Sequence, residues 1–266
     1  MEFFRELEIK DNSQPDNFKE LLESTKVLVL RKKPSKHDGN YYQALAQTAG
    51  YLTMFEENHI SGELKRSWLE IRYVPEKSEE TYKNSNHFQP LHTDYAYFSI
   101  AVEISFFYCI EQAEIGGSTY FIDTERVAQI LKLVDPVLFQ EVIGTPIRYS
   151  RGTDEFSFNE DMILKPTQTG GYEMTWNYFR VMRNNPDSMA LAEKFKLFLE
   201  THVERCGEFV SIKLQPGDAV FFRDREVLHG RNSFIGNRHL NKGGIILNDI
   251  ERKTEILNSY LKRLNG

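Results

Sequence analysis

The chain has 266 residues, of which 40% are hydrophobic and 13% aromatic, which is enough for a sizeable core and within the range of a single all-β domain. The formal net charge is −6 at pH 7, and the 33 Lys and Arg residues are scattered, so neither a nucleic-acid surface nor an anionic-membrane surface is expected. We expect a small-molecule partner, and we leave a homo-oligomer open.

The start of the chain does not resemble a signal peptide. Residues 1–8 carry acidic side chains where a signal peptide needs basic ones, and no apolar segment follows. No apolar run approaches the roughly 18 residues that span a bilayer. Cys109 and Cys206 are too few for a disulfide framework and are expected to be reduced thiols. The sequence therefore predicts a cytoplasmic protein without a membrane partner.

The first third of the chain is predicted to contain helices around a short strand. Residues 16–26 and 39–50 have helical periodicity, and residues 27–30 between them form an apolar run typical of a buried strand. Residues 68–74 alternate in polarity as a half-buried strand does. The polar loop 75–86 then leads directly to the main candidate motif, which makes it a candidate lid.

The rest of the chain is predicted to be strand-rich, with helices in insertions. A hairpin turn is expected at Gly170 and Gly171. In chain order, the predicted elements are strands at 100–110 and 118–122, helices at 124–134 and 136–142, strands and loops over 147–176, a helix at 187–206, strands at 209–214, 219–223 and 243–247, and a helical tail.

This pattern predicts a mainly β fold with flanking helices, in the form of a double-sheet jelly roll, also called a double-stranded β-helix. A doubly wound parallel fold would need regular alternation of strands and helices with Gly-rich phosphate turns, and the sequence lacks them. We expect one domain over 1–266, with helical support at 1–66, a jelly-roll core with insertions at 67–249, and the helical tail at 250–266.

The main candidate motif is formed by His92 and Asp94. Residues two apart in an extended segment point to the same face, so an imidazole and a carboxylate at this spacing can bind one metal ion. Such pairs also arise by chance in a chain with 7 His and 39 acidic residues. A third ligand is expected from His229 at a strand end, where Gly230 allows close approach of the backbone. Two histidines and a carboxylate favour non-heme Fe(II) that works on O2.

Two further residues fit a dicarboxylate cosubstrate. If a strand returns past the metal, the Arg238 guanidinium can form a bidentate pair with a carboxylate, a role for which arginine is better shaped than lysine. Thr119, after the Gly116-Gly117 turn, offers a hydroxyl to the same carboxylate. Taken alone, the two residues read as a surface arginine and a strand threonine.

Together the motifs resemble the TauD/TfdA-type Fe(II)/2-oxoglutarate dioxygenases, and they are most similar to the γ-butyrobetaine and trimethyllysine hydroxylase branch. The similar strings are residues 91–94, 116–119, 227–231 and 238–240. The resemblance implies a clavaminate synthase-like jelly roll that binds Fe(II) through His92, Asp94 and His229. It also implies that Arg238 and Thr119 bind 2-oxoglutarate, which O2 converts to succinate and CO2.

Substrate contacts are predicted from their position beside the motifs or, by the resemblance, at the mouth of the barrel. The candidates are Arg72, Asn86, Gln89, Tyr95, Tyr97, Asn177, Arg180 and Arg231. The arginines at 72 and 180, with Asn177, favour a carboxylate-bearing substrate. The alternative for each is a solvated polar residue or a rim tyrosine, and for Arg231 it is a role in supporting its strand.

The predicted function is hydroxylation of an unactivated C–H bond in a small polar metabolite, an amino acid or a derivative. A desaturase or another oxidative tailoring enzyme of a small biosynthetic pathway is the alternative within the class. Outside the class, a zinc hydrolase would need neither Arg238 nor Thr119. A non-catalytic ligand-binding jelly roll would tolerate the loss of His92.

Overall fold

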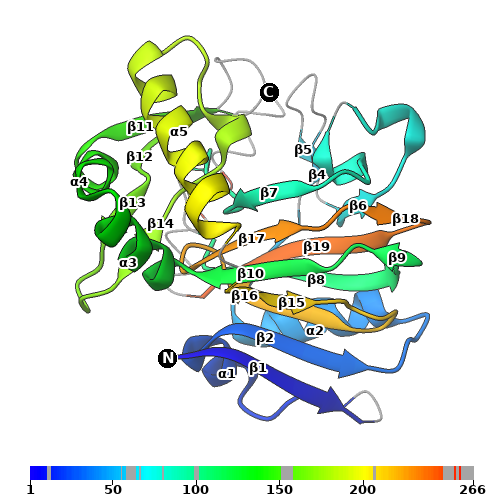
Figure 1. Cartoon of the computed structure of the whole chain (residues 1–266). Helices are drawn as coiled ribbons and strands as arrows, with labels where there is room; N and C mark the ends of the chain where they lie inside the picture. The colour runs from blue at the N-terminus through cyan, green and yellow to red at the C-terminus, as the bar shows by residue number, and fades with distance from the viewer. Residues whose placement is uncertain are drawn as a thin grey trace.

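Two β-sheets form the centre of the protein in the computed structural model (Figure 1). The structure describes residues 1–10, 13–54, 56–57, 64–65, 67–79, 81–98, 102–150, 158–205 and 208–247, with Glu255 and Asn258. Helices lie on the outside of the sheets, so the predicted mainly β fold with flanking helices is confirmed.

The larger sheet contains seven strands. Its first pair, β1 with β2, is parallel, and the other neighbours run antiparallel. In spatial order the strands are β1 (Glu2–Ile9), β2 (Thr25–Lys32), β16 (Ala219–Arg223), β8 (Ile104–Glu111), β19 (His239–Ile246) and β3 (Tyr51–Thr53), and β6 (Leu69–Arg72) also pairs with β19. Because β2 lies beside β16, strands from the N-terminal part of the chain and from residues 219–246 belong to one sheet.

The smaller sheet has four strands and is antiparallel throughout. In spatial order the strands are β15 (Val210–Ile212), β10 (Thr119–Asp123), β17 (Val227–Arg231) and β7 (Gln89–His92). All the predicted motifs except the one around Arg238 therefore lie on or beside this sheet.

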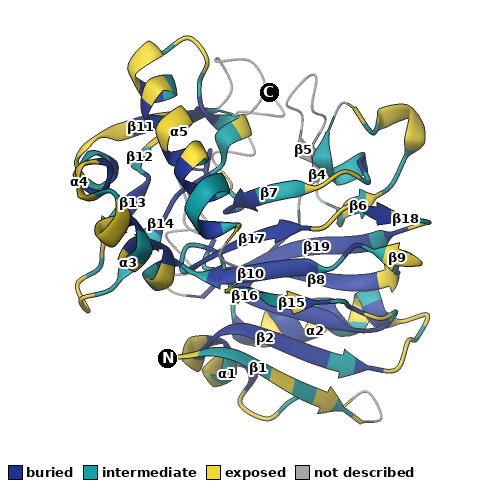
Figure 2. Ribbon diagram, viewed as in Figure 1, coloured by how far each residue is buried: buried dark blue, intermediate teal, exposed yellow. Residues whose placement is uncertain are grey.

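An apolar core fills the space between the sheets. In β2, Val27 and Val29 belong to this core, whereas Leu28 and Leu30 pack with the helices on the outside. Successive side chains of a strand point to opposite faces, so one run of four apolar residues contributes to two cores. Figure 2 shows the central strands as buried along most of their length.

Two helices cover the outer face of the larger sheet, namely α1 (Phe18–Ser24) and α2 (Asp38–Ala49). The α2 residues buried there recur at the three- and four-residue spacing of one helix face. They are Tyr42, Leu45, Ala46 and Ala49. The helices predicted at 16–26 and 39–50 are confirmed, with slightly different ends.

A second group of helices and hairpins lies between β10 and β15 in sequence and covers the smaller sheet, on the left of Figure 1. Its elements are α3 (Thr124–Val134), α4 (Pro136–Gly144), β11 (Pro146–Ser150), β12 (Phe158–Met162), β13 (Leu164–Pro166), β14 (Tyr172–Met174) and α5 (Pro186–Phe198), which a π-helical turn (Leu199–Val203) extends. The insertion packs on the smaller sheet through Tyr120 and Leu228. The predicted helices of this region and the hairpin turn at Gly170 are confirmed.

The remaining elements are short. They are the pair β4 (Glu56–Glu57) and β5 (Leu64–Lys65), the pair β9 (Ile115–Gly116) and β18 (Phe234–Ile235), and the 3-10 turns Pro75–Lys77, Tyr82–Asn84 and Tyr178–Arg180. Among the described residues, no helix combines the length and the apolar character that crossing a bilayer requires.

The N-terminal 66 residues provide more than helical support. β1, β2 and β3 all precede residue 67 and belong to the larger sheet. The division expected at residue 67 stays a prediction. β1 is absent from the predicted elements because it is an edge strand whose side chains are half-buried or exposed, without a clear alternation. The helical tail expected at 250–266 lies outside the described residues, apart from Glu255 and Asn258.

Candidate metal centre and its two cavities

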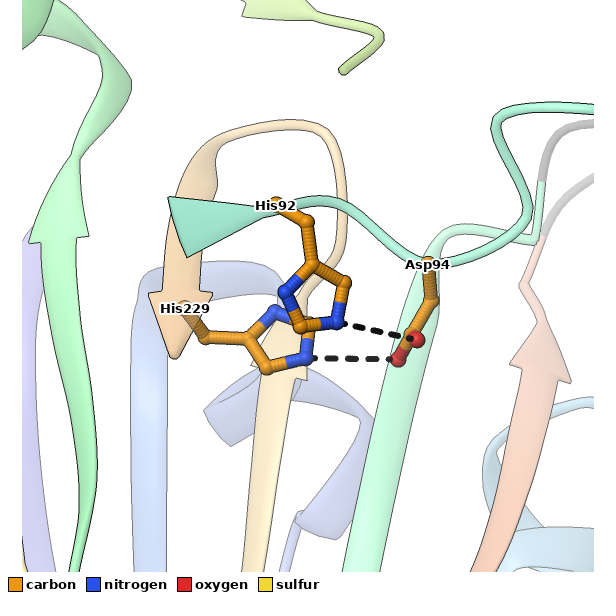
Figure 3. A group of neighbouring side chains, drawn as sticks. All are labelled: His92, Asp94 and His229. Atoms are coloured by element: carbon orange, nitrogen blue, oxygen red, sulfur yellow. Dashed lines mark ion pairs between the residues drawn. The ribbon is translucent and has the colours of Figure 1, made fainter. Parts of the chain in front are cut away.

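Strand pairing brings the two candidate histidines together. His92 ends β7 and lies opposite His229 of β17 in the register of the smaller sheet, and their ring centroids are 4.2 Å apart. Asp94 follows His92 by two residues, and its carboxylate faces both imidazole rings (Figure 3). The structure therefore brings the three predicted ligand side chains together.

The spacing of these side chains fits a shared metal ion. Nε2 of His92 is 3.9 Å from Asp94 Oδ1, and Nε2 of His229 is 3.7 Å from Asp94 Oδ2. These contacts are too long for hydrogen bonds, and the buried Oδ2 has no hydrogen-bond partner among the described residues. Metal–ligand bonds of about 2.0–2.2 Å would bridge such gaps. A buried carboxylate oxygen without a partner, beside two imidazoles, is a donor set that favours a cation.

His92 is held in the tautomer that a metal ligand needs. Its Nδ1 lies 2.9 Å from the carbonyl oxygen of Pro90, to which it donates when the ring proton is on Nδ1. Nε2 then keeps its lone pair, and it accepts from the Gln89 amide at 3.2 Å. Burial lowers the pKa of His92 and that of His229, and this effect outweighs the negative charge of Asp94, which raises both pKa values. Both rings are therefore neutral at pH 7, as metal binding requires.

Neighbouring groups hold Asp94 as a carboxylate. Burial alone raises the pKa of Asp94, but the neighbouring Lys242 ammonium is the main cause that lowers that pKa below its usual range. Nζ of Lys242 is 2.5 Å from Oδ1 of Asp94, which leaves Oδ2 for a metal. The Asp94 backbone N–H donates to Oδ1 of Asp224 at 2.9 Å. Burial and the charge of Asp94 raise the pKa of Asp224.

His229 lies in the middle of β17, and not at a strand end as predicted. The glycine after it is needed for strand packing. A Cβ atom on Gly230 would lie 2.3 Å from the Tyr120 ring and 2.7 Å from the carbonyl oxygen of Gln89. Tyr120 also donates from its hydroxyl to that Gln89 oxygen at 2.9 Å. Gly230 therefore allows β10, β17 and β7 to pack closely around His229, rather than allowing a ligand to approach the backbone.

A small cavity of about 50 Å³ adjoins the three candidate ligands and is lined by both predicted cosubstrate residues. Arg238 is buried; it donates from Nε to the Gly117 carbonyl oxygen at 3.1 Å and from Nη2 to Thr119 Oγ1 at 3.4 Å. Gly116 and Gly117 both have positive φ, which glycine adopts without strain. Burial is the main cause that lowers the pKa of Arg238 to about 9, so the guanidinium remains cationic at neutral pH.

A larger cavity of about 640 Å³ opens beside the same ligands. The two cavities share Ile71, Gln89, His92 and Asp94 in their walls, so a molecule in one can meet a molecule in the other at the candidate metal. Five of the eight predicted substrate residues line the larger cavity. They are Gln89, Tyr95, Tyr97, Asn177 and Arg180.

The other three predicted substrate residues lie elsewhere. Arg72 and Asn86 line neither cavity. Arg72 follows Ile71 in β6, and because neighbouring strand residues point to opposite faces, its side chain points away from the cavity that Ile71 lines. Arg231 lines the small cavity and not the large one. This arrangement does not support the expected substrate contacts at Arg72 and Asn86.

Two buried charged residues at the site are absent from the predicted set. Lys242 lies on β19, whereas Arg238 precedes that strand, and the pairing of β19 with β8 shifts register between His239 and Leu240. Strand periodicity alone therefore does not place the two side chains on one face. Asp224 lies in the turn between β16 and β17, and it also accepts from Ser105 Oγ at 3.4 Å. No sequence pattern marks Asp224, because only the tertiary fold brings it to Asp94.

Sequence comparison matches the chain to curated enzymes over part of its length. A mitochondrial trimethyllysine dioxygenase of Mus musculus is 27% identical over 159 residues, which cover 56% of this chain and 38% of that protein. The γ-butyrobetaine dioxygenase of Homo sapiens is 24% identical over 159 residues, covering 57% and 41%. The chain thus spans about two fifths of the length of these relatives.

Structure comparison matches nearly the whole chain. An asparagine oxygenase in complex with Fe(II), 2S,3S-3-hydroxyasparagine and succinate aligns with a TM-score of 0.68 and 13% identity over 90% of this chain and 81% of that one. A putative α-ketoglutarate-dependent taurine dioxygenase from Burkholderia xenovorans gives 0.65 and 18% over 93% and 88%. These likenesses confirm the predicted double-stranded β-helix fold.

A family model adds the assignment. The model described as "Taurine catabolism dioxygenase TauD, TfdA family" matches residues 4–243, which include both sheets, the insertion and all five residues predicted to bind metal and cosubstrate. The chain belongs to the TauD/TfdA family of dioxygenases.

Proposed function

We propose that the protein is an Fe(II)/2-oxoglutarate-dependent dioxygenase that hydroxylates a small polar metabolite, an amino acid or a derivative of one. The observation that carries this proposal is the meeting of His92, Asp94 and His229 with Arg238 and Thr119 in the wall of one small cavity. A metal triad alone suits several chemistries, but a buried guanidinium beside it suits a carboxylate cosubstrate.

The reaction consumes one O2 for each turnover. One oxygen atom enters succinate as 2-oxoglutarate loses CO2, and the other forms the hydroxyl group of the product. Iron, when bound by His92, Asp94 and His229, supplies the activation of O2. The two neutral imidazoles and the carboxylate would hold the ion, a donor set that favours non-heme Fe(II).

The protein's own residues orient the two organic molecules. Arg238 binds the distal carboxylate of 2-oxoglutarate through its guanidinium, and Thr119 donates a hydrogen bond to the same group. Strands of both sheets surround this end of the site. The prime substrate enters from the larger cavity and meets the cosubstrate at the shared wall.

The larger cavity favours a molecule that carries both charges. Its walls contain cationic side chains from Lys196 and Arg180 and carboxylates from Glu200 and Glu204, in addition to aromatic rings. A zwitterion such as an amino acid finds partners of both signs there. Among the proteins compared, one carries hydroxyasparagine and others are named for trimethyllysine and γ-butyrobetaine, which supports an amino-acid-like substrate.

A desaturase or another oxidative tailoring enzyme uses the same centre and differs only in how the substrate lies beside it. A zinc hydrolase is less favoured, because it gives Arg238 and Thr119 no role. A non-catalytic binding jelly roll likewise leaves the unpartnered Oδ2 of Asp94 unexplained. A cytoplasmic location and a homo-oligomer stay predictions.

The proposal is tested with the reconstituted protein. Fe(II) and 2-oxoglutarate added without O2 are expected to give a visible charge-transfer band, and admission of O2 is expected to yield succinate. A screen of free, N-methylated and N-acylated amino acids should then find a compound that accelerates succinate release and gains one oxygen atom by mass. Loss of two hydrogens instead would favour the desaturase. Turnover of an ester or amide without O2 or 2-oxoglutarate would overturn the proposal in favour of the zinc hydrolase.

A further inference from the structure

Arg231 ties the metal-binding strand to the rim of the larger cavity. It ends β17, two residues after His229, and is only 3% exposed. Its Nη1 donates to the carbonyl oxygen of Tyr82 at 3.2 Å, and its Nη2 donates to that of His87 at 2.8 Å. Both carbonyl groups belong to residues 81–88, which we call the rim segment. One planar guanidinium therefore holds two points of this segment.

The rim segment forms part of the wall where a substrate enters. Five of its residues line the larger cavity, namely Thr81, Tyr82, Lys83, Ser85 and His87. The segment also has contacts of its own with the sheets. Asn86 accepts from the Phe234 N–H at 3.0 Å, Asn84 accepts from the Val74 N–H at 3.0 Å and donates from its side chain to the Arg72 carbonyl oxygen at 3.1 Å, and the Phe88 ring stacks on that of Tyr120 at 5.8 Å. Arg231 adds two buried hydrogen bonds to these contacts, one at Tyr82 and one at His87.

The same arginine also faces the small cavity. Arg231 lines it beside Arg238, and the two guanidinium groups lie over one ring, that of Phe234, at 5.1 and 5.8 Å. The Nε atom of Arg231 is buried and has no hydrogen-bond partner among the described residues. Within that part of the chain, no carboxylate forms an ion pair with either guanidinium.

Two buried guanidinium groups without a carboxylate partner among the described residues favour the binding of an anion. A buried charge is costly unless a partner compensates it, and Arg238 also repels Arg231, since their charges lie close together. A dicarboxylate bound in the small cavity would neutralise both groups. The free Nε–H of Arg231 can then donate to that anion while Nη1 and Nη2 stay on the rim segment.

We propose that Arg231 is a positioning residue that couples occupation of the cosubstrate cavity to the order of the rim segment. This inference rests on the proposed function, because the anion is taken to be 2-oxoglutarate. A guanidinium is planar, so an anion that fixes Nε also fixes the directions of Nη1 and Nη2. The rim is then more strongly held when the cosubstrate is bound. By linkage, a substrate that orders the rim tightens cosubstrate binding by the same factor.

The first test uses the unmodified protein. Fe(II) is added without O2, 2-oxoglutarate is titrated in, and its binding is measured by calorimetry while hydrogen exchange of residues 81–88 is followed by mass spectrometry. Bound 2-oxoglutarate is expected to slow exchange of these amides by about fivefold or more. Binding without any change in exchange would overturn the coupling and leave the proposed function intact. Failure of 2-oxoglutarate to bind would overturn both.

The second test separates the charge of Arg231 from its shape. Arg231→Lys keeps a cation, but one ammonium group cannot replace the planar fork. The variant is expected to bind 2-oxoglutarate within about tenfold of the unmodified protein and to lose the ligand-dependent protection of the rim segment. Full protection in this variant would contradict the proposal.

A matched control is Arg183→Lys. Arg183 also donates to a carbonyl oxygen in the wall of the larger cavity, that of Tyr178 at 3.4 Å, but it does not line the small cavity. Its replacement is expected to leave 2-oxoglutarate binding and rim protection unchanged. If Arg183→Lys abolishes the protection as well, the effect is not specific to Arg231 and the proposal fails. If Arg231→Lys does not fold, the exchange measurement on the unmodified protein decides alone.

Discussion

The two cavities at the candidate metal are built in different ways. Each residue that lines the small cavity lies on a strand or within two residues of one. The larger cavity takes most of its wall from loops and from the insertion. These wall residues are Ser78, Glu79, Thr81, Tyr82, Lys83, Ser85, His87, residues 176–180, Lys196, Leu199, Glu200 and Glu204. Hydrogen-bonded register therefore fixes the small cavity, whereas the packing of connecting segments shapes the larger one.

Because of this difference, we expect the small cavity to serve the reaction and the larger cavity to determine which substrate is used. A change of one residue in strand register would turn every ligand side chain to the other face, so the small cavity tolerates little variation. Loops accept substitutions and insertions more readily and commonly carry binding residues. We therefore expect mutations in the small cavity to alter the use of iron and 2-oxoglutarate, and mutations in the larger cavity to alter the use of the prime substrate alone.

The largest effect is expected from His229→Ala. Loss of one ligand removes several kcal/mol of metal-dependent stabilisation, so succinate formation should fall by about a thousandfold or more. Succinate release in the presence of Fe(II), O2 and 2-oxoglutarate measures the change. A variant that folds normally by circular dichroism and keeps more than a tenth of the activity would show that His229 is not a ligand.

A smaller effect is expected from Arg238→Gln. Removal of a charged hydrogen-bonding partner should raise the 2-oxoglutarate concentration for half-maximal activity by about tenfold to a hundredfold. The half-maximal concentration of the prime substrate should hardly change. Thr119→Val is a comparison that removes a hydroxyl group and no charge; a hydrogen bond to a charged partner is worth about 1.5–3 kcal/mol. An effect of Arg238→Gln on the prime substrate alone would assign this arginine to the other cavity.

The complementary change is Arg180→Gln in the larger cavity. Arg180 is partly exposed and lies over the Tyr97 ring at 5.3 Å. Loss of this guanidinium should lower the affinity for the prime substrate by about fivefold to tenfold. It should leave the substrate-independent conversion of 2-oxoglutarate to succinate unchanged. Steady-state titration of each compound measures both values. A matching rise in the 2-oxoglutarate requirement would mean that the cavities are not independent at this residue.

The smallest effect is expected on the free energy of unfolding of the metal-free protein when the pH is lowered. Burial lowers the pKa values of His92 and His229 in the folded chain, so below pH about 6.5 the unfolded chain binds more protons than the folded one. The free energy of unfolding of the metal-free protein should therefore fall as pH drops, by at most about 1.4 kcal/mol per pH unit for each ring. Urea unfolding with a chelator at pH 7.5 and 5.5 measures it.

His229→Gln should make this pH profile shallower, since it removes one of the two titrating rings. His87→Gln is the control, because the side chain of His87 is 55% exposed. A stability that is equal at both pH values in the unmodified protein would show that the rings are not held neutral by burial.

The residues of the small cavity can be predicted from the sequence better than those of the larger cavity. The two-residue spacing of His92 and Asp94 and the glycine turn before Thr119 are local patterns, so strand periodicity was enough to propose them. Arg72 illustrates the limit: the family resemblance suggested a substrate contact at the mouth of the barrel, but the alternation that turns Ile71 inward turns Arg72 outward. Lys242 and Asp224 depend on pairings between distant segments, which no local pattern encodes.

The ion pair between Lys242 and Asp94 has a consequence for how the protein acquires its metal. Many small metal sites fold only when the ion is present, since the clustered ligands repel one another without it. Here an ammonium group of the chain itself balances the carboxylate at 2.5 Å. We therefore expect the strands around Asp94 to assemble without a metal ion and to receive it afterwards.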